Sequence, residues 1–326
     1  MVIRDQAAAW AQRALAGAAL LLCSEVIWWS HDPAHYSPTQ WIGLALLYLV
    51  FGALALDLLA RFGVSDWRGA LPVAGVYGLL HGALIGGDFA AVQFSMVTRP
   101  LGLHTLGGGV LGLLLAFWLL DGRGFLWWRA AILAWIGLAA GMWIRRFPLL
   151  ESTPFAPPAL AAVALYLAVG LLLLGGLRWL VRLAATRRMV SLRLHNWELG
   201  VLTAILVVAF FSSGGQGAIT SLGGAVLGLL LGYLVVVLYF QRDTRRAVLV
   251  DRLRPPASPA WVAYAVYALA LLLPVIFGYS LPGEAADDLV LQVMLAVFTV
   301  FSVTWLPALS IWLGFRAYVR LFREEG

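Results

Sequence analysis

Long apolar stretches alternate with short polar segments, many of them basic, along almost the whole chain. A helix that crosses a bilayer needs roughly 20 consecutive, mostly apolar residues. The pattern therefore predicts an all-α polytopic integral membrane protein with about ten transmembrane helices. The predicted spans cover residues 8–29, 40–60, 69–91, 101–120, 127–145, 157–178, 197–212, 217–240, 260–280 and 289–315.

One ten-residue pattern occurs twice within these stretches. Residues 106–115 read LGGGVLGLLL, and residues 222–231, 116 positions later, read LGGAVLGLLL, so nine of ten aligned residues are identical. An even number of predicted crossings separates the copies, which is typical of parallel repeats related by an axis along the membrane normal. Spans 1–4 and 5–8 are therefore predicted to be a parallel four-helix repeat, followed by a C-terminal helical hairpin. Within one membrane domain, 1–326, the predicted parts are repeat one, 1–121, repeat two, 122–241, and the terminal hairpin, 259–326.

Glycines within the repeated pattern recur at a spacing of four residues. Gly108 and Gly112 have this spacing in the first copy, and Gly224 and Gly228 have it in the second. Small residues four apart form a smooth stripe on a helix, which another helix backbone can approach closely. We therefore predict helix packing at these four glycines, and a substrate pathway along them is the alternative.

Composition strengthens the membrane interpretation and removes several kinds of chemistry. The chain is 62% hydrophobic and 12% charged, whereas a soluble domain averages about 45–50% apolar and about 25% charged residues. All 22 basic residues are arginines, so a lysine Schiff base is excluded. The single cysteine, Cys23, excludes an internal disulfide and thiolate metal clusters.

The arginines predict the orientation of the spans, because cytoplasmic loops are enriched in basic residues. With a cytoplasmic N-terminus, 19 of the 22 arginines lie inside, and only Arg99, Arg145 and Arg146 lie outside. We therefore predict a plasma (inner) membrane protein with both termini in the cytoplasm. The basic loops 179–196 and 242–258 are expected to contact anionic lipid, or alternatively to act as plain topology determinants. This charge flanks apolar helices, so nucleic acid is not a predicted partner.

Repeat one carries ionisable residues within its predicted spans, and repeat two has almost none at the aligned positions. These residues are Glu25, His81, Asp88, Arg99 and His104. His81 and Asp88 are seven residues apart, which on a continuous helix would place them on one face, roughly 10 Å apart along the axis. Gly82 and Gly86 lie between them as another small-residue row.

Ionisable groups at membrane depth are costly, by at least about 2.5–3.5 kcal/mol for a charge at the bilayer centre. Such groups persist where they are paired or line a wet cavity. We therefore predict a polar cavity, open to the outer side, in which these five residues bind substrate or protons. The alternatives are structural: interfacial ion pairs, a helix-capping His104 and a hydrogen-bonded core His81. No catalytic residue and no metal ligand is predicted.

The sequence contains no phosphate-binding GxxxxGK[ST] loop, no HExxH and no GxSxG motif, so no ATPase, zinc protease or serine hydrolase motif is present. The favoured function is a small-molecule membrane transporter, with proton coupling through His81 and Asp88. One alternative is a non-catalytic or quinone-handling subunit of a larger membrane complex, by fold analogy alone. Another is a membrane-embedded enzyme acting on lipid or a lipid-linked substrate at the outer face. The sequence names no cofactor, and both other proteins and a second copy of the chain remain open as partners.

Overall fold

The computed structural model describes residues 2–29, 36–90, 94–121, 125–149, 156–184, 191–212, 219–242, 248–252, 261–281 and 289–324. Every regular element in these ranges is a helix. Eight helices there are long and apolar enough to cross a membrane. The prediction of a helical membrane protein is confirmed at this level.

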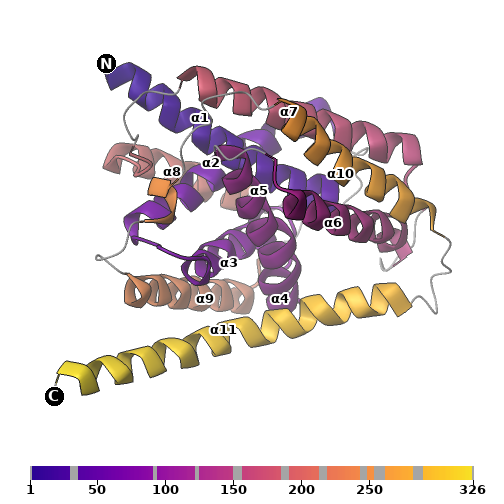
Figure 1. Ribbon diagram of the computed structural model, residues 1–326. Helices are drawn as coiled ribbons and strands as arrows, with labels where there is room; N and C mark the ends of the chain where they lie inside the picture. The colour runs from indigo at the N-terminus through magenta and orange to yellow at the C-terminus, as the bar shows by residue number, and fades with distance from the viewer. Residues whose placement is uncertain are drawn as a thin grey trace. The chain divides into compact units, whose positions relative to one another are not determined.

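Each predicted span contains a helical segment (Figure 1). The first half of the chain forms α1 (Val2–Leu21), η1 (Leu22–Ile27), α2 (Pro38–Arg61), α3 (Trp67–Leu84), α4 (Ser95–Thr98), η3 (Arg99–Val110), α5 (Leu111–Leu120), α6 (Trp127–Arg146) and η4 (Phe147–Leu149). The second half forms α7 (Leu160–Ala184), α8 (Asn196–Ser212), α9 (Ser221–Gln241), η6 (Leu249–Arg252), α10 (Trp261–Ser280) and α11 (Leu289–Glu324). Neither α3 nor α8 is among the eight membrane-length apolar helices, so the count of ten spans stays a prediction.

The chain divides into two compact units whose ranges interleave. Unit 1 contains Met1–Leu56, Leu111–Leu192 and Asp251–Leu295, and unit 2 contains Asp57–Val110, Arg193–Val250 and Ala296–Gly326. This division does not follow the boundaries of the two proposed repeats, which stay a prediction.

Close helix crossings at glycines hold unit 1 together. Helix α6 packs along α10, and a Cβ added at Gly137 or Gly141 would overlap a carbonyl oxygen of α10. Gly278 of α10 lies equally close to α6. At Gly112 of α5, an added Cβ would lie 2.8 Å from a side-chain carbon of Leu20 on α1 and 3.0 Å from its Cα. The absence of a side chain therefore sets how closely these backbones approach, as small-residue packing in membranes requires.

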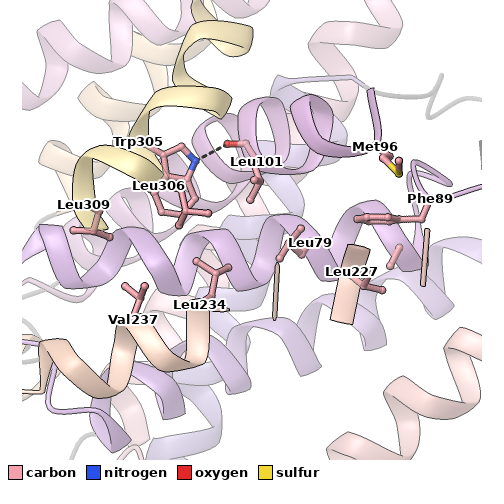
Figure 2. Close-up of a cluster of buried hydrophobic side chains, with 11 residues drawn as sticks. Leu79, Phe89, Met96, Leu101, Leu227, Leu234, Val237, Trp305, Leu306 and Leu309 are labelled. Carbon is pink, nitrogen blue, oxygen red and sulfur yellow. Dashed lines mark hydrogen bonds between the residues drawn. The ribbon is translucent and has the colours of Figure 1, made fainter. Parts of the chain in front are cut away.

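Unit 2 is organised around α3, which packs against η3 and α9. Its core cluster, drawn in Figure 2, consists of Leu79, Ala83, Phe89, Met96, Leu101, Leu227, Leu234, Val237, Trp305, Leu306 and Leu309. Within this core the indole nitrogen of Trp305 on α11 donates a 3.1 Å hydrogen bond to the carbonyl oxygen of Leu101 on η3 (Figure 2). The polar atom of a large buried side chain is thus satisfied by a helix carbonyl.

The two glycine stripes differ in their surroundings. Gly108 is buried and Gly112 lies at the close approach to Leu20. At Gly228 an added Cβ would meet no atom of the described residues within 4 Å, and at Gly224 it would meet only Ile219, at 3.7 Å. No such close approach occurs at Gly228 among the described residues, and helix packing at this glycine stays a prediction.

Candidate functional site

Four of the five predicted polar residues meet in unit 2. His104 Nε2 lies 3.1 Å from Asp88 Oδ2, within hydrogen-bond distance. The imidazole rings of His81 and His104 have their centroids 4.1 Å apart. Arg99 Nη1 lies 3.8 Å from Asp88 Oδ1. We call His81, Asp88, Arg99 and His104 the His–Asp cluster.

Arg99 is the partly exposed member of the cluster, and the other three side chains are buried. The Arg99 side chain is 45% exposed, whereas the Asp88 side chain is 1% exposed. His104 is 4% exposed and His81 is fully buried. The contacts therefore form a linear order, Arg99–Asp88–His104–His81, that leads from a partly exposed cation to a buried imidazole.

Asp88 reaches the cluster from a turn, and not from the helix on which the sequence analysis placed it. Helix α3 ends at Leu84, so the predicted helical spacing of His81 and Asp88 is wrong. The chain reverses through Gly87, whose φ of 64° lies in the left-handed region that favours glycine. The backbone N–H of Asp88 then donates a 3.0 Å hydrogen bond to the carbonyl oxygen of Gly82. This turn folds the carboxylate back over the end of α3.

A row of glycines on α3 and its terminal turn makes room for the cluster. A Cβ added at Gly82 would lie 2.7 Å from Asp88 Oδ2, and one at Gly86 would lie 3.2 Å from His104 Nε2. At Gly78 it would overlap the Pro100 carbonyl oxygen of η3. Gly82 and Gly86 stand out as a row in the sequence, and Gly78, which was not predicted, continues the same spacing of four residues.

Arg99 and His104 lie on η3, a twelve-residue π-helix. π-Helical segments are rare and are frequent at functional sites. In η3, Pro100 has no backbone N–H to donate, and Gly102 has a low helix propensity. The hydroxyl of Thr105 donates a 2.7 Å hydrogen bond to the Pro100 carbonyl oxygen five residues earlier. This helix type was not predicted from the hydropathy pattern, and the proline followed by several glycines is the sequence signal that could have indicated it.

The start of α9 is hydrogen-bonded to Phe89, the residue that follows Asp88. The backbone N–H of Thr220 donates a 3.2 Å hydrogen bond to the carbonyl oxygen of Phe89. The Thr220 hydroxyl caps α9 by accepting a 3.0 Å hydrogen bond from Gly223 N–H. Thr220 is the sequence counterpart of His104 in the proposed repeat two, so in the second copy of the pattern this position caps a helix.

Glu25 lies in unit 1 with partners of its own. It is fully buried within the π-helix η1, and the Tyr48 hydroxyl donates a 2.6 Å hydrogen bond to its Oε1. Tyr36 lies beyond η1, and its pKa is raised, first by burial and then by the charge of the Glu25 carboxylate and its hydrogen bond. The grouping of Glu25 with the His–Asp cluster in one cavity stays a prediction.

Within the described ranges, no group of three or more His, Cys, Asp or Glu side chains is arranged to hold a metal ion. A groove of about 520 Å³ lies in unit 1, and its lining is apolar, with Trp135 and Leu138 from α6 and Pro274 and Phe277 from α10.

Comparison of the chain with protein-family models, with curated proteins and with solved structures finds no match.

Proposed function

We propose that the protein is a small-molecule transporter of the plasma (inner) membrane and that the His–Asp cluster takes up and releases the protons that drive it. One observation above all supports this proposal. A carboxylate and two imidazoles lie in contact within an apolar helical protein. His104 Nε2 is 3.1 Å from Asp88 Oδ2, and the ring centroids of His81 and His104 are 4.1 Å apart. Ionisable groups at membrane depth mark ion and proton pathways in many membrane proteins, and histidine changes its charge near neutral pH.

The geometry favours one mobile proton at a time. Two imidazolium charges about 4 Å apart would repel each other by about 4 kcal/mol at an effective dielectric constant of about 20. Protonation of one imidazole therefore opposes protonation of the other. Asp88 stabilises the charge when it is on His104, because it lies within hydrogen-bond distance of that ring. The cluster can thus accept a proton near Arg99, hold it on His104 and release it again.

The rest of the proposed arrangement comes from the sequence. Ten spans, built as a parallel repeat and a terminal hairpin, would place the arginine-rich loops and both termini in the cytoplasm. The cluster would then open toward the outer side through Arg99, and the cytoplasmic loops would bind anionic lipid. Repeat two, with Thr220 as a helix cap, would serve as scaffold for a site that only repeat one contains.

A second function, a subunit of a larger membrane complex, is favoured by one surface. An added Cβ would meet no described atom within 4 Å at Gly228 or at Gly232 of α9. Such an open small-residue face suits close approach by a helix of another chain. Co-purification of a stoichiometric partner from a membrane extract would support this function over a transporter acting alone.

The test is proton movement in liposomes loaded with the pH-sensitive dye pyranine. Purified protein is reconstituted and exposed to one solute at a time: methanesulfonate as an anion, tetramethylammonium as a cation, glycine betaine as a zwitterion and glycerol as a neutral solute. We expect one solute class to drive proton entry. Proton entry should be lost in His81→Phe and His104→Thr, which replace each histidine by the residue near its place in repeat two.

His195→Phe is the matched control, because His195 is exposed and lies outside the cluster. It should move protons as the wild-type protein does. Proton entry that is the same in the cluster variants as in the wild type, or absent with every solute, contradicts the proposal.

A further inference from the structure

Arg99 combines two properties that a structural ion pair does not need. Its side chain is 45% exposed, and its nitrogen lies 3.8 Å from the nearest oxygen of Asp88. A direct hydrogen bond between a guanidinium and a carboxylate is about 2.7–2.9 Å long. The guanidinium carries five N–H donors, and a separation of 3.8 Å leaves this contact electrostatic. Arg99 is therefore held near Asp88 without being locked to it.

The groups in and around the His–Asp cluster set the charge of the site. From η3 they are Arg99 and His104, the two cationic or titratable neighbours of the carboxylate. From α3 come His81, which contacts the His104 ring, and Tyr77, which contacts the His81 ring. From the start of α9, Thr220 contacts the carbonyl oxygen of Phe89, the residue after Asp88, and its hydroxyl does not titrate. With Asp88 ionised and both histidines neutral, Arg99 and Asp88 balance each other. One added proton leaves the cluster with a net charge of +1.

We propose that the transported substrate is a small anion, which binds the Arg99 guanidinium when the cluster takes up a proton. The proton neutralises the Asp88 carboxylate, directly or by forming an imidazolium at His104 that pairs with it. Arg99 then loses its counter-charge and takes the carboxylate, sulfonate or phosphate group of the substrate. Release of the anion restores the Arg99–Asp88 pair when the proton leaves. Proton and anion consequently cross together. This inference rests on the proposed transport function.

Charge balance distinguishes the anion from other substrates. A protonated cluster that held a neutral solute would keep a net charge of +1, and an uncompensated charge within a membrane protein is costly. A cationic substrate would add a second positive charge next to Arg99. An anion returns the site to neutrality, so it is the ligand class that makes the protonated state stable.

The experiment measures binding to the purified full chain in detergent, by isothermal titration calorimetry, between about pH 5 and pH 8. The probe is methanesulfonate, which stays a monoanion throughout this range, and tetramethylammonium is the cation of similar size. We expect methanesulfonate to bind about tenfold or more tightly at the acid end. Asp88→Asn, which mimics the protonated carboxyl, should bind tightly at both ends of the range.

Variants of Arg99 separate anion binding from folding. Arg99→Gln should lower the affinity for methanesulfonate by about tenfold or more. Arg99→Lys, which keeps the charge, should retain much of this affinity. Arg145→Gln is the control: Arg145 is predicted on the same side of the membrane, but it donates a 2.9 Å hydrogen bond to the Tyr279 carbonyl oxygen in unit 1. It should bind as the wild type does. Equal binding at both pH values, undiminished binding by Arg99→Gln, or preference for tetramethylammonium overturns the proposal.

The two proposals fail in different ways. If a cation or a neutral solute drives proton entry in liposomes, the transport function stands and the anion inference is wrong. If methanesulfonate binds at Arg99 with the expected pH dependence but no solute moves protons, the anion site stands and the transport function is wrong.

Discussion

The two copies of the repeated pattern show how little local identity fixes the structure around it. Residues 106–115 and 222–231 share nine of ten residues. The first copy begins inside the π-helix η3 and becomes regular only at Leu111, whereas the second lies entirely within the α-helix α9. We attribute the difference to the residues before each copy. Pro100 and His104 precede the first, while Thr220, a good N-cap, opens the second.

Different hydrogen bonds stabilise the beginnings of α9 and η3. In α9, a local hydrogen bond from Gly223 to the Thr220 hydroxyl satisfies one of the free N–H groups at the helix start. In η3, support comes from a distance as well, through the Trp305 indole bonded to the Leu101 carbonyl oxygen. A helix stabilised by tertiary contacts can present side chains that propensity alone would not place. Here those side chains are Arg99 and His104.

The largest effect is expected at the glycine stripes. Gly112→Leu would force a branched side chain against the backbone of Leu20, so we expect a destabilisation of about 3 kcal/mol or more. Gly228→Leu should change stability by less than about 0.5 kcal/mol, because its face is open in the described part of the chain. Thermal unfolding followed by tryptophan fluorescence measures both. Equal destabilisation would mean that another helix covers Gly228 and would remove this difference between the copies.

A smaller loss is expected at the glycine row beneath the cluster. Gly82→Ala places a methyl group 2.7 Å from Asp88 Oδ2 and 2.8 Å from Pro100 Cγ, so the turn or η3 must shift, at about 1–3 kcal/mol. Proton entry in pyranine-loaded liposomes should fall together with the stability. Gly176→Ala in α7 is the control, because its added Cβ meets nothing within 4 Å in the described residues. A Gly82→Ala protein as stable and active as this control would show that the carboxylate does not need its present position.

Sequence patterning predicted the helices well because hydropathy reports directly on burial in lipid or protein. It also selected His81, Asp88, Arg99 and His104, because ionisable residues stand out in apolar segments. The path that joins them was not predictable in the same way. The position of Asp88 depends on one residue with positive φ, Gly87, and hydropathy is insensitive to whether a helix is α or π.

The long-range bond that supports η3 should contribute about 1–2 kcal/mol. Trp305→Phe keeps an aromatic ring but removes the N–H, leaving the buried Leu101 carbonyl oxygen without this donor. We expect a lower thermal midpoint together with faster amide hydrogen exchange in η3 than in α9, measured by mass spectrometry. Exchange that rises equally in both helices would indicate general loosening of unit 2, and would contradict a specific role of Trp305 in holding η3.

The smallest effect is expected at the cap of the second copy. Thr220→Ala removes the hydroxyl that accepts from Gly223 N–H, which typically costs about 1 kcal/mol. Because the bond is local, hydrogen exchange should accelerate in the first turn of α9 and stay unchanged in η3. Thr220→Ser, which keeps the hydroxyl, should exchange like the wild type.

The reverse exchange tests the comparison directly, because His104→Thr places the same capping residue at the equivalent point of the proposed repeat one. If a threonine there is sufficient to begin a regular α-helix, exchange across residues 105–110 should slow toward that of α9. If it does not slow, tertiary contacts such as the Trp305 bond hold the π-helix whatever residue occupies position 104, and the preceding sequence is not what separates the two copies.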